Sequence, residues 1–336
     1  MTDPSAGTAM RDGDGASAGP VATGATWRDY LAIARIDHVT KHIFILPGVV
    51  LALVLRGATG SPFPSILLGL GVAICIASAN YVINEWLDRD FDRHHPTKSA
   101  RAAVQHALRA ELVIVEWAGL IAAGLLLAWL SSKVMLLIAT AFALQGVIYN
   151  VRPLRLKDIA FLDVISESIN NPLRLMIGWA MIDPHALPPS SIILAYWFGG
   201  AFLMAAKRLS EYREIVADHG RALLVRYRAS FANYDDVSLT ISCFLYALLS
   251  SFCLAVFLIK YRIEYLITVP AVIILFGEYL ALAMRPNSSA QRPEKLYRER
   301  QLLLMVSLVG ALFTLATFVP MPFLATLAEQ HFITMS

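Results

Sequence analysis

Acidic side chains stand at helical spacing in the segment NEWLDRDFDRHHPTK, residues 84–98, which directly follows an apolar run. If the helix continues through this segment, Asn84, Asp88 and Asp92 stand at i, i+4 and i+8 and form one polar stripe. Carboxylates one turn apart repel each other, and desolvation at a membrane edge adds to that cost. A cation between them relieves both effects, and Mg²⁺ prefers one or two carboxylates together with phosphate oxygens. The stripe therefore predicts a Mg²⁺ site that holds a diphosphate.

A second polar group lies in the apolar segment DIAFLDVISESINNPLRLMIGW, residues 158–179. In a helix, five of its polar side chains fall within roughly a 100° arc. They are Asp163, Glu167, Asn170, Asn171 and Arg174. Ionisable residues inside membrane helices usually face the bundle interior and mark a route for a substrate or an ion. Two simpler interpretations stay open: a solvated helix end for the first segment, and an internal pair of an acid with Arg174 that only fixes helix contacts.

Basic residues flank both acidic groups. Arginine offers phosphate a planar fork and lysine a compact charge. Each base taken singly is explained by the excess of basic residues in cytoplasmic loops of membrane proteins. Together they predict a phosphate-binding surface formed by Lys98, Arg101, Lys157, Lys207 and Arg208.

The composition indicates an integral membrane protein, because 57% of the 336 residues are hydrophobic, 16% are charged and the mean hydropathy is +0.59. The net charge of +3 gives no field that favours nucleic acid. Cys75, Cys243 and Cys253 lie in apolar runs without a metal-binding spacing, so they are expected to be small buried hydrophobic residues. Residues 1–26 are predicted to be a disordered tail before a single domain at 27–336.

The fold class predicted from the apolar stretches is all-α, an integral membrane bundle of nine transmembrane helices. Those stretches are roughly 42–58, 64–87, 110–131, 134–150, 160–182, 189–206, 237–259, 264–284 and 302–325. Residues 27–41 mix aromatic and aliphatic side chains with charged ones, which predicts a helix lying in the membrane interface.

The predicted loops differ strongly in basic residues. Loops after even-numbered spans hold nineteen Lys and Arg residues, whereas the opposite loops hold only Arg56, Lys133, Lys260 and Arg262. Cytoplasmic loops carry the excess of bases, so the N-terminus and the candidate site are expected to face the cytoplasm from the inner (plasma) membrane. The loop at 207–236 is long enough to cap the site, although its basic amphipathic character also suits a segment resting on anionic lipid.

The two motifs resemble those of the UbiA superfamily of intramembrane prenyltransferases, over roughly residues 27–325. The first family motif, Asn-Asp-x-x-Asp-x-x-x-Asp, stands here as NEWLDRDFD, with Glu85 in place of an aspartate, and Ala102 replaces the proline of HPTKxxRP sequences. The resemblance implies a nine-helix fold in which Asn84, Asp88 and Asp92 bind Mg²⁺ and diphosphate. It also makes Asp88, Asp92 and Asp163 the candidate catalytic residues. The acid of the second motif that binds the metal stays open between Asp158, Asp163 and Glu167.

Three segments are most similar to decaprenyl-phosphate phosphoribosyltransferases: DRHHPTKSAR, LKDIAFLDVISES with its later Arg174, and AAKRLSEYRE. This branch implies transfer of 5-phosphoribose from phosphoribosyl diphosphate to a polyprenyl phosphate, for arabinan-type cell-wall glycans, with Lys41 as a further matching base. The expected partners are this lipid substrate, a donor that bears a diphosphate, and membrane lipid. The alternatives are prenyl transfer to an aromatic acceptor of the 4-hydroxybenzoate type and, from another class, a transporter whose polar stripes line an ion route.

Overall fold

The computed structural model describes residues 23–327 except 37, 58–61, 96, 287, 292–295 and 297, and it leaves the side chains of 23, 38–41 and 325 undescribed. The first 22 residues of the predicted tail therefore lie outside the described part of the chain. The last residues of that tail include β1, Thr23–Gly24, which pairs in parallel with β2, His106–Ala107.

Helices make up almost all of the described chain. The α-helices are α1 (Trp27–Ala34), α2 (Leu46–Arg56), α3 (Phe63–Asp92), α4 (Ala102–Gln105), α5 (Ala110–Ser131), α6 (Lys133–Asn150), α7 (Leu162–Ser168), α8 (Asn170–Ala180), α9 (Ser190–His219), α10 (Arg221–Tyr227), α11 (Asp236–Tyr261), α12 (Thr268–Ala283), α13 (Arg300–Phe318) and α14 (Pro322–Leu327). Short 3₁₀ segments include η1 (His38–Ile45), η2 (Lys98–Ala100), η3 (Leu156–Asp158), η4 (Ala229–Asn233) and η5 (Ile263–Ile267).

Seven helices in the described residues are long and apolar enough to cross a membrane. They correspond to seven of the nine predicted spans, and η5 joins α12 in one of them. The other two predicted spans are occupied by shorter helices: α2 follows η1 in the first, and α7 and α8 share the fifth. The all-helical membrane fold is confirmed, whereas nine full-length spans are not.

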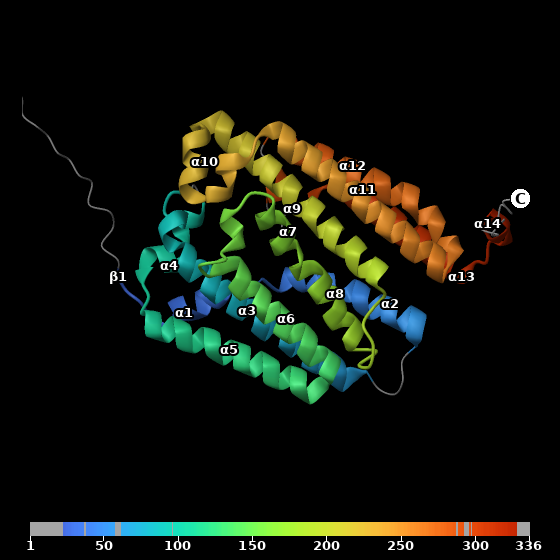
Figure 1. The fold of residues 1–336 in the computed structure, drawn as a ribbon, viewed down its shortest axis with the longest axis horizontal. Coiled ribbons are helices and arrows are strands. Elements are labelled where there is room, and N and C mark those ends of the chain that lie inside the picture. Colours follow the sequence, from blue (N-terminus) through green and yellow to red (C-terminus); the bar gives the residue numbers. More distant parts are fainter. Residues whose placement is uncertain are drawn as a thin grey trace, which may run out of the picture.

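The helices form two groups with the fifth span between them (Figure 1). On one side α3 lies against α5 and α6, and on the other α9 lies against α11 and α12. The helices α7 and α8 run between these groups and contact both α6 and α9. The short helices α4 and α10 lie at one end of the bundle, on the left in Figure 1. The polar residues of the fifth span are therefore placed inside the bundle, between the two groups.

The fifth predicted span is divided into α7 and α8 at Ile169. Pro172 stands in the first turn of α8 and has no N–H to donate to the carbonyl group of Ser168, four residues earlier. A continuous helix would leave that carbonyl without a partner. The break separates the acids of α7 from the asparagines and Arg174 of α8.

The helix α8 packs on α2 with backbone-to-backbone contact. A Cβ added at Gly48 would lie 2.0 Å from the carbonyl oxygen of Leu175, and one at Gly178 would lie 2.1 Å from that of Ile45. Only glycine allows the two helices to approach this closely. These two glycines therefore fix α8, and the polar residues it carries, against the first span.

The substitution Gly178→Ala is expected to lower the free energy of unfolding by about 3 kcal/mol, because the new methyl group must push the two backbones apart. Gly119→Ala is the matched control, since nothing lies within 4 Å of a Cβ at that helical position. The control should be neutral or stabilising, as alanine has the higher helix propensity. Thermal unfolding in detergent micelles measures both, and equal melting temperatures for the two variants would contradict the close contact.

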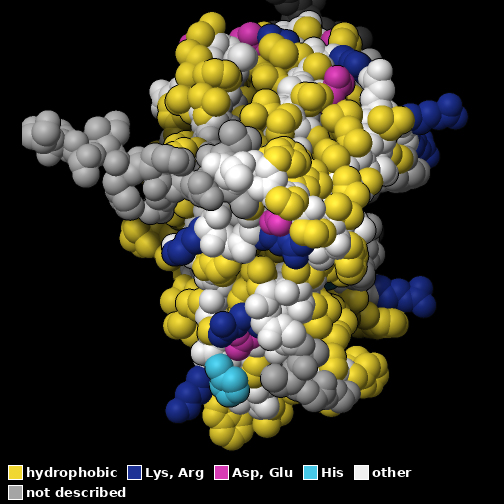
Figure 2. All heavy atoms as spheres, turned by 90° about the vertical axis from the view of Figure 1, so that its right-hand side faces the viewer, with side chains coloured by type: hydrophobic (Ala, Val, Ile, Leu, Met, Phe, Trp, Pro, Cys, Tyr) yellow, Lys and Arg dark blue, Asp and Glu magenta, His cyan; other side chains and the backbone are white. Residues whose placement is uncertain are grey.

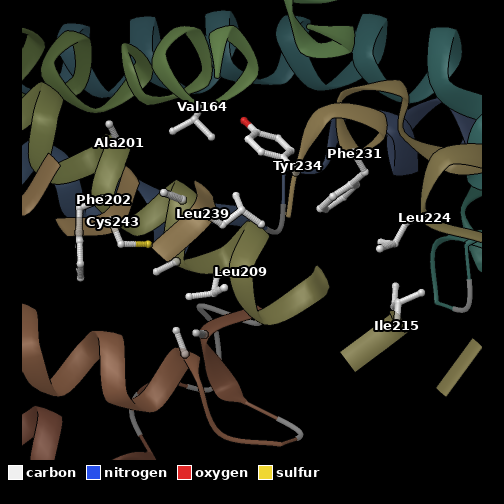
Figure 3. Close-up of a cluster of buried hydrophobic side chains, with 14 of the residues drawn as sticks. Val164, Ala201, Phe202, Leu209, Ile215, Leu224, Phe231, Tyr234, Leu239 and Cys243 are labelled. Carbon is white, nitrogen blue, oxygen red and sulfur yellow. The ribbon is translucent and has the colours of Figure 1, made fainter. Parts of the chain in front are cut away.

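The chain after α9 folds back onto the end of the bundle. Leu224 of α10, Phe231 of η4 and the following Tyr234 are buried in one hydrophobic cluster with Leu209 of α9 and Leu239 of α11 (Figure 3). α9 itself continues to His219, so the segment that covers the bundle is 220–235 rather than the predicted loop 207–236. Leu224, Tyr227, Phe231 and Tyr234 of this segment are buried in the protein, whereas Val225 is 38% exposed, so the segment, called the cap, covers the end of the bundle.

The opposite end of the bundle presents mainly hydrophobic side chains, with charged ones scattered among them (Figure 2). Large apolar residues are also exposed along the helices, such as Trp129 of α5 and Phe252 of α11, each 67% exposed. Apolar exposure on this scale is typical of surfaces that face lipid. α1 fits the predicted interfacial helix, because Ile33 is buried while Trp27 and Leu31 are exposed.

Candidate active site

Asp88 is the centre of a small ion-pair cluster at the end of α3. Its Oδ1 lies 2.8 Å from Nη2 of Arg155 and 2.6 Å from Nζ of Lys157. Both bases come from the loop between α6 and α7 and are more than nine-tenths buried. Since α3 continues to Asp92, the helical stripe predicted from the sequence is confirmed.

Side-chain contacts join the first motif to the second. Asn84 donates to Oδ1 of Asn150 at 2.6 Å, and the same oxygen accepts from Lys157 at 2.8 Å. Lys157 also lies over the ring of Tyr149, whose hydroxyl donates to Glu167 at 2.7 Å. The acidic residues of the first motif and those of the second motif therefore face one shared site.

The remaining acids of the first motif have separate partners. Asp92 is buried and pairs with Arg101. Glu85, which replaces the usual aspartate, lies 2.8 Å from Nη2 of Arg35 and accepts from the backbone N–H of Ala103. Glu85 thus ties α1 and α4 to α3, and the longer glutamate side chain serves the fold rather than the metal.

Asp163 is completely buried and its carboxylate is surrounded by donors. It accepts from the hydroxyl groups of Tyr234 at 2.6 Å and Ser230 at 3.2 Å, and from Nε of Arg208 at 3.1 Å. Arg228 lies 3.4 Å away. Three of these four partners belong to the cap segment 220–235, so Asp163 holds the cap.

Glu167 is the acid of the second motif that faces the site, because its side chain is 29% exposed. It accepts from Arg208 at 3.0 Å and from Tyr149. The side chain of Asp158 has the same exposure, but it pairs with Arg155 and not with the groups that Glu167 contacts. Arg208 binds Asp163, Glu167 and also Glu211, so its charge is already matched by three carboxylates.

Lys98 and Lys207 differ from the other bases of the predicted phosphate-binding surface. Within the described chain, no carboxylate oxygen lies within 4.0 Å of either ammonium group. Lys98 lies over the ring of Tyr227 in the cap, and burial lowers the pKa of its ammonium below the usual range. Glu211 attracts both lysines and Glu167 also attracts Lys207, but neither ammonium group is held in a close ion pair within the described chain.

His95 holds the loop that carries Lys98. Its Nδ1 accepts from the backbone N–H groups of Thr97 at 3.1 Å and Lys98 at 3.3 Å, while its Nε2 lies 3.3 Å from Glu211. Burial is the main cause that lowers the pKa of His95, which favours the neutral ring required by this pattern. The imidazole therefore links the end of α3 to α9.

Several site residues escaped the sequence analysis, namely Tyr149, Asn150, Arg155, Glu211, Arg228 and His95. Arg155 and Arg228 were counted there only as topology-setting bases. Arg155 has a left-handed backbone, with φ of 32°, and its contacts with Asp88 and Asp158 hold that strained conformation. No spacing rule predicts these residues, because each reaches the site from another element.

Arg174 does not form the internal ion pair considered from the sequence. It is buried in α8, and no carboxylate among the described residues lies within 4.0 Å of it. Lys41 lies in η1, and its side chain is outside the described part of the structure.

The described residues hold no cluster of three His, Cys, Asp or Glu side chains close enough to bind a metal alone. The donor set still suits Mg²⁺, which takes hard oxygen ligands and commonly shares its shell with substrate phosphates. Asp88 is the best placed protein ligand, since it is partly exposed and faces the contacts that lead to Glu167. Its two basic partners would be released to phosphate oxygens when a cation replaces them.

The family model of the UbiA prenyltransferase family matches residues 45–299. The chain belongs to this family. The match includes both acidic motifs, the cap segment and the bases described above. The resemblance seen in the sequence is thereby confirmed, and the chain is a membrane transferase of the UbiA family.

Curated UbiA relatives carry two different activities in their names. A protoheme IX farnesyltransferase of Geobacillus kaustophilus is 27% identical, over 57% of this chain and 64% of its own length. A decaprenyl-phosphate phosphoribosyltransferase of Mycolicibacterium smegmatis is 30% identical, over 48% of this chain and 51% of its own length. The matches thus span about half to two thirds of these relatives and leave the substrate open.

Solved UbiA structures share the fold. A UbiA homolog from Archaeoglobus fulgidus, bound to DMAPP and Mg²⁺, has a TM-score of 0.65 and 20% identity, covering 87% of this chain and all of that one. The same homolog bound to GPP and Mg²⁺ has a TM-score of 0.64 and 21% identity. At this level of identity, the likeness confirms the arrangement of helices.

Proposed function

We propose that this UbiA-family protein is a Mg²⁺-dependent transferase that moves 5-phosphoribose from phosphoribosyl diphosphate to a polyprenyl phosphate and releases diphosphate. The observation that carries the proposal is the pair of lysines, Lys98 and Lys207, whose ammonium groups have no carboxylate oxygen within 4.0 Å in the described chain, beside acids already paired with other bases. A prenyl diphosphate brings one diphosphate group. Phosphoribosyl diphosphate brings a further phosphate on its 5-carbon, which would use this additional positive charge.

The ion pairs at Asp88 suggest how the donor binds. Arg155 and Lys157 neutralise this carboxylate before substrate arrives. Asp88 would hold a Mg²⁺ ion that arrives with the diphosphate, and the ion would supply positive charge to the leaving group. Arg155 and Lys157 are then able to turn to the phosphate oxygens. The site therefore exchanges one set of ion pairs for another and never leaves a buried charge unpaired.

The residues of the site suit a dissociative displacement. A phosphate oxygen of the acceptor forms a bond to the anomeric carbon as the bond from that carbon to the diphosphate breaks, and the electron pair leaves with the diphosphate. Lys98, Arg101 and Lys157 stabilise the departing charge in a site shielded from water. The nucleophile is already an anion, so no general base is required. The cap segment, held by Asp163, excludes water that would hydrolyse the oxocarbenium-like carbon.

An apolar cavity inside the bundle offers room for the lipid chain. It has a volume of about 860 Å³ and lies between α2, α8, α9, α11, α12 and α13. Leu51, Phe202 and Phe257 are among its apolar walls, and Asn171 is one of its few polar residues. Burial of isoprenoid methylene and methyl groups in such a cavity is worth about 0.8 kcal/mol per CH₂.

Purified protein with Mg²⁺ is expected to consume phosphoribosyl diphosphate together with a polyprenyl phosphate and to release diphosphate. The assay is a coupled diphosphate measurement, run in parallel with several prenyl diphosphates and aromatic acceptors. Removal of Mg²⁺ with a chelator should stop the reaction, and its return should restore it. Turnover only with a prenyl diphosphate would overturn the donor assignment.

The second candidate is prenyl transfer from a prenyl diphosphate to an aromatic or haem acceptor. The names of the farnesyltransferase relatives favour it, and the apolar cavity would then hold the chain of the donor. A transporter is disfavoured because the acids gather at one end of α3 and in the short helix α7, whereas the rest of α3 is apolar. Metal-dependent ion flux in liposomes without turnover would favour the transporter. We place the site at the cytoplasmic face of the inner membrane, on the distribution of basic loops.

Activity should fall as the pH rises through about 8, because burial lowers the pKa of Lys157 to about 8 despite the opposing effect of Asp88. A neutral amine no longer attracts the diphosphate. In Lys157→Arg the charge persists, so the alkaline limb of kcat/KM should move to higher pH. An unmoved limb would assign it to another group.

The same shift predicts a change of stability with pH. The pKa of Lys157 in the folded protein lies below its ordinary value of 10.5, so the unfolded chain binds more protons between the two values. The free energy of unfolding contributed by Lys157 should therefore rise as the pH increases through this range. Lys157→Met should remove this rise, which chemical denaturation at several pH values measures.

A further inference from the structure

Arg174 carries a buried positive charge in the middle of the bundle that the site described above does not use. The residue is 6% exposed. Its Nη1 donates to the carbonyl oxygen of Asn170 at 3.2 Å, and its guanidinium lies 5.3 Å from the ring centroid of Phe142. Its Nε–H is buried without a hydrogen-bond partner, and the described chain places no carboxylate within 4.0 Å.

A charge in this position is costly. Removing a cation from water requires compensation by an anion or by a full set of hydrogen bonds. One carbonyl group, a hydrogen bond with the side chain of Tyr81 and an aromatic face supply only part of it, because none of them carries a full negative charge in the neutral state. Arginine in a membrane span is rare and normally has a partner in the bundle interior. The partner missing from the protein is therefore expected to be supplied by a ligand.

The neighbouring polar atoms indicate the kind of ligand. Oδ1 of Asn170, one turn before Arg174, is also buried without a partner. A ligand that satisfies both groups must accept from the arginine N–H and donate to the amide oxygen. A phosphate monoester does both, because near neutral pH part of it still carries one P–OH group. Neither a neutral alcohol nor a simple carboxylate provides this combination together with a full negative charge.

The apolar cavity reaches this group of residues. Asn171 and Tyr196 line the cavity, and the charge of Arg174 interacts with the hydroxyl group of Tyr196. Asn171 lies against Gly200 of α9, where a Cβ would come within 2.2 Å of its Nδ2. The glycine makes room for the amide at the cavity wall. Asn171 and Tyr196 thus form a polar part of the cavity wall next to Arg174, whereas Arg174 and Asn170 are not among the residues that line the cavity and most of its wall is apolar.

We propose that Arg174, with Asn170, Asn171 and Tyr196, forms an anion site inside the bundle that binds the phosphate monoester of a polyprenyl lipid whose chain occupies the apolar cavity. The assignment of this lipid as the acceptor rests on the proposed function. This site is separate from the cluster around Asp88, because Arg174 stands on α8, beyond the break at Ile169, and contacts none of the motif acids. Donor and acceptor phosphates would then be held by different bases, which keeps their negative charges apart until the reaction.

The test is the binding of farnesyl phosphate, farnesol and inorganic phosphate to the purified full chain in detergent micelles, measured by isothermal titration calorimetry. Arg174→Gln should weaken the binding of farnesyl phosphate roughly 10- to 100-fold, the loss typical of a charged hydrogen bond. Binding of farnesol should be unchanged. Arg174→Lys should restore part of the affinity. Arg89→Gln, which removes an arginine near the first motif, should leave farnesyl phosphate binding intact.

Several outcomes would overturn the proposal. Equal losses for farnesyl phosphate and farnesol in Arg174→Gln would mean that Arg174 only supports the cavity wall. Inorganic phosphate that competes at millimolar concentration, in the wild type but not in Arg174→Gln, would assign the site to free phosphate instead of lipid. Should Arg174→Gln fail to fold, the affinity ratio of farnesyl phosphate to farnesol in Arg174→Lys decides, since a loss of preference for the phosphate confirms the anion site and an unchanged ratio contradicts it.

The experiment also separates this inference from the proposed function. Arg174-dependent binding of farnesyl phosphate without turnover of phosphoribosyl diphosphate would leave the anion site standing and reject the donor. Turnover of phosphoribosyl diphosphate with farnesyl phosphate, unaffected in KM by Arg174→Gln, would support the function and reject the anion site.

Discussion

Asp88→Asn is expected to lower kcat by roughly 1,000-fold or more, because one carboxylate would supply both a metal ligand and the charge that positions the diphosphate. The amide keeps the shape of the side chain and loses its negative charge. Lys157 then lacks its carboxylate partner and Arg155 keeps only Asp158, although the bound donor can still occupy both bases. Turnover of phosphoribosyl diphosphate and its dependence on Mg²⁺ concentration measure the effect.

The control is Asp90→Asn, two residues after Asp88 in α3 and outside the stripe. Asp90 is exposed and lies 3.7 Å from Arg93, an exposed pair of little energetic weight. This variant should keep its activity and its melting temperature. If Asp88→Asn retained most of its turnover, the cluster around Asp88 would be structural and the metal would have to bind elsewhere.

Alanine at Asp88 and Asp92 together should abolish turnover, and the structure changes what this variant does to stability. From the sequence, removal of clustered like charges relieves repulsion and leaves the protein folded. In the structure each of the two carboxylates is paired with buried or half-buried bases instead. Removing one partner of such a pair costs about 3–5 kcal/mol, so the double alanine variant is a poor test of catalysis and asparagine is preferable.

Asp163→Asn and Glu167→Gln should separate stability from catalysis in the second motif. Asp163 is inaccessible and binds Ser230, Tyr234 and Arg208, so its replacement should lower the free energy of unfolding by about 3–5 kcal/mol. Glu167 is partly exposed and faces the site. Its replacement should lower kcat by roughly 100-fold, with a smaller loss of stability.

The comparison needs two readouts on the same preparations. Thermal unfolding in detergent reports the stability, and limited proteolysis within residues 220–235 reports whether the cap is released. Glu167→Asp serves as the conservative variant, because it keeps the charge and shortens the reach. If Asp163→Asn were stable and inactive while Glu167→Gln remained active, Asp163 would be the catalytic acid, as the sequence first indicated.

Parts of the site were predictable because they depend on short-range geometry. The stripe of Asn84 and Asp88 follows from helical spacing alone, and α3 confirms it. The excess of polar groups in the fifth span indicated an internal site, since lipid rejects them. The same spacing could not predict that Asp163 and Glu167 make different contacts, because the two acids stand one turn apart in α7. Their roles differ because the cap folds over the first and leaves the second open.

The sequence by itself determined that the chain is a helical membrane protein, that its acids gather at the ends of two helices, and which family it resembles. These properties follow from residue type and from the spacing of residues along a helix, and the sequence gives both directly. Only the tertiary structure decided which base neutralises which acid, that Lys98 and Lys207 have no carboxylate beside them, and that Arg174 is buried without a counter-ion in the described chain. Charges interact through space over a few ångströms and with the burial of both partners, and neither distance nor burial is encoded in sequence separation.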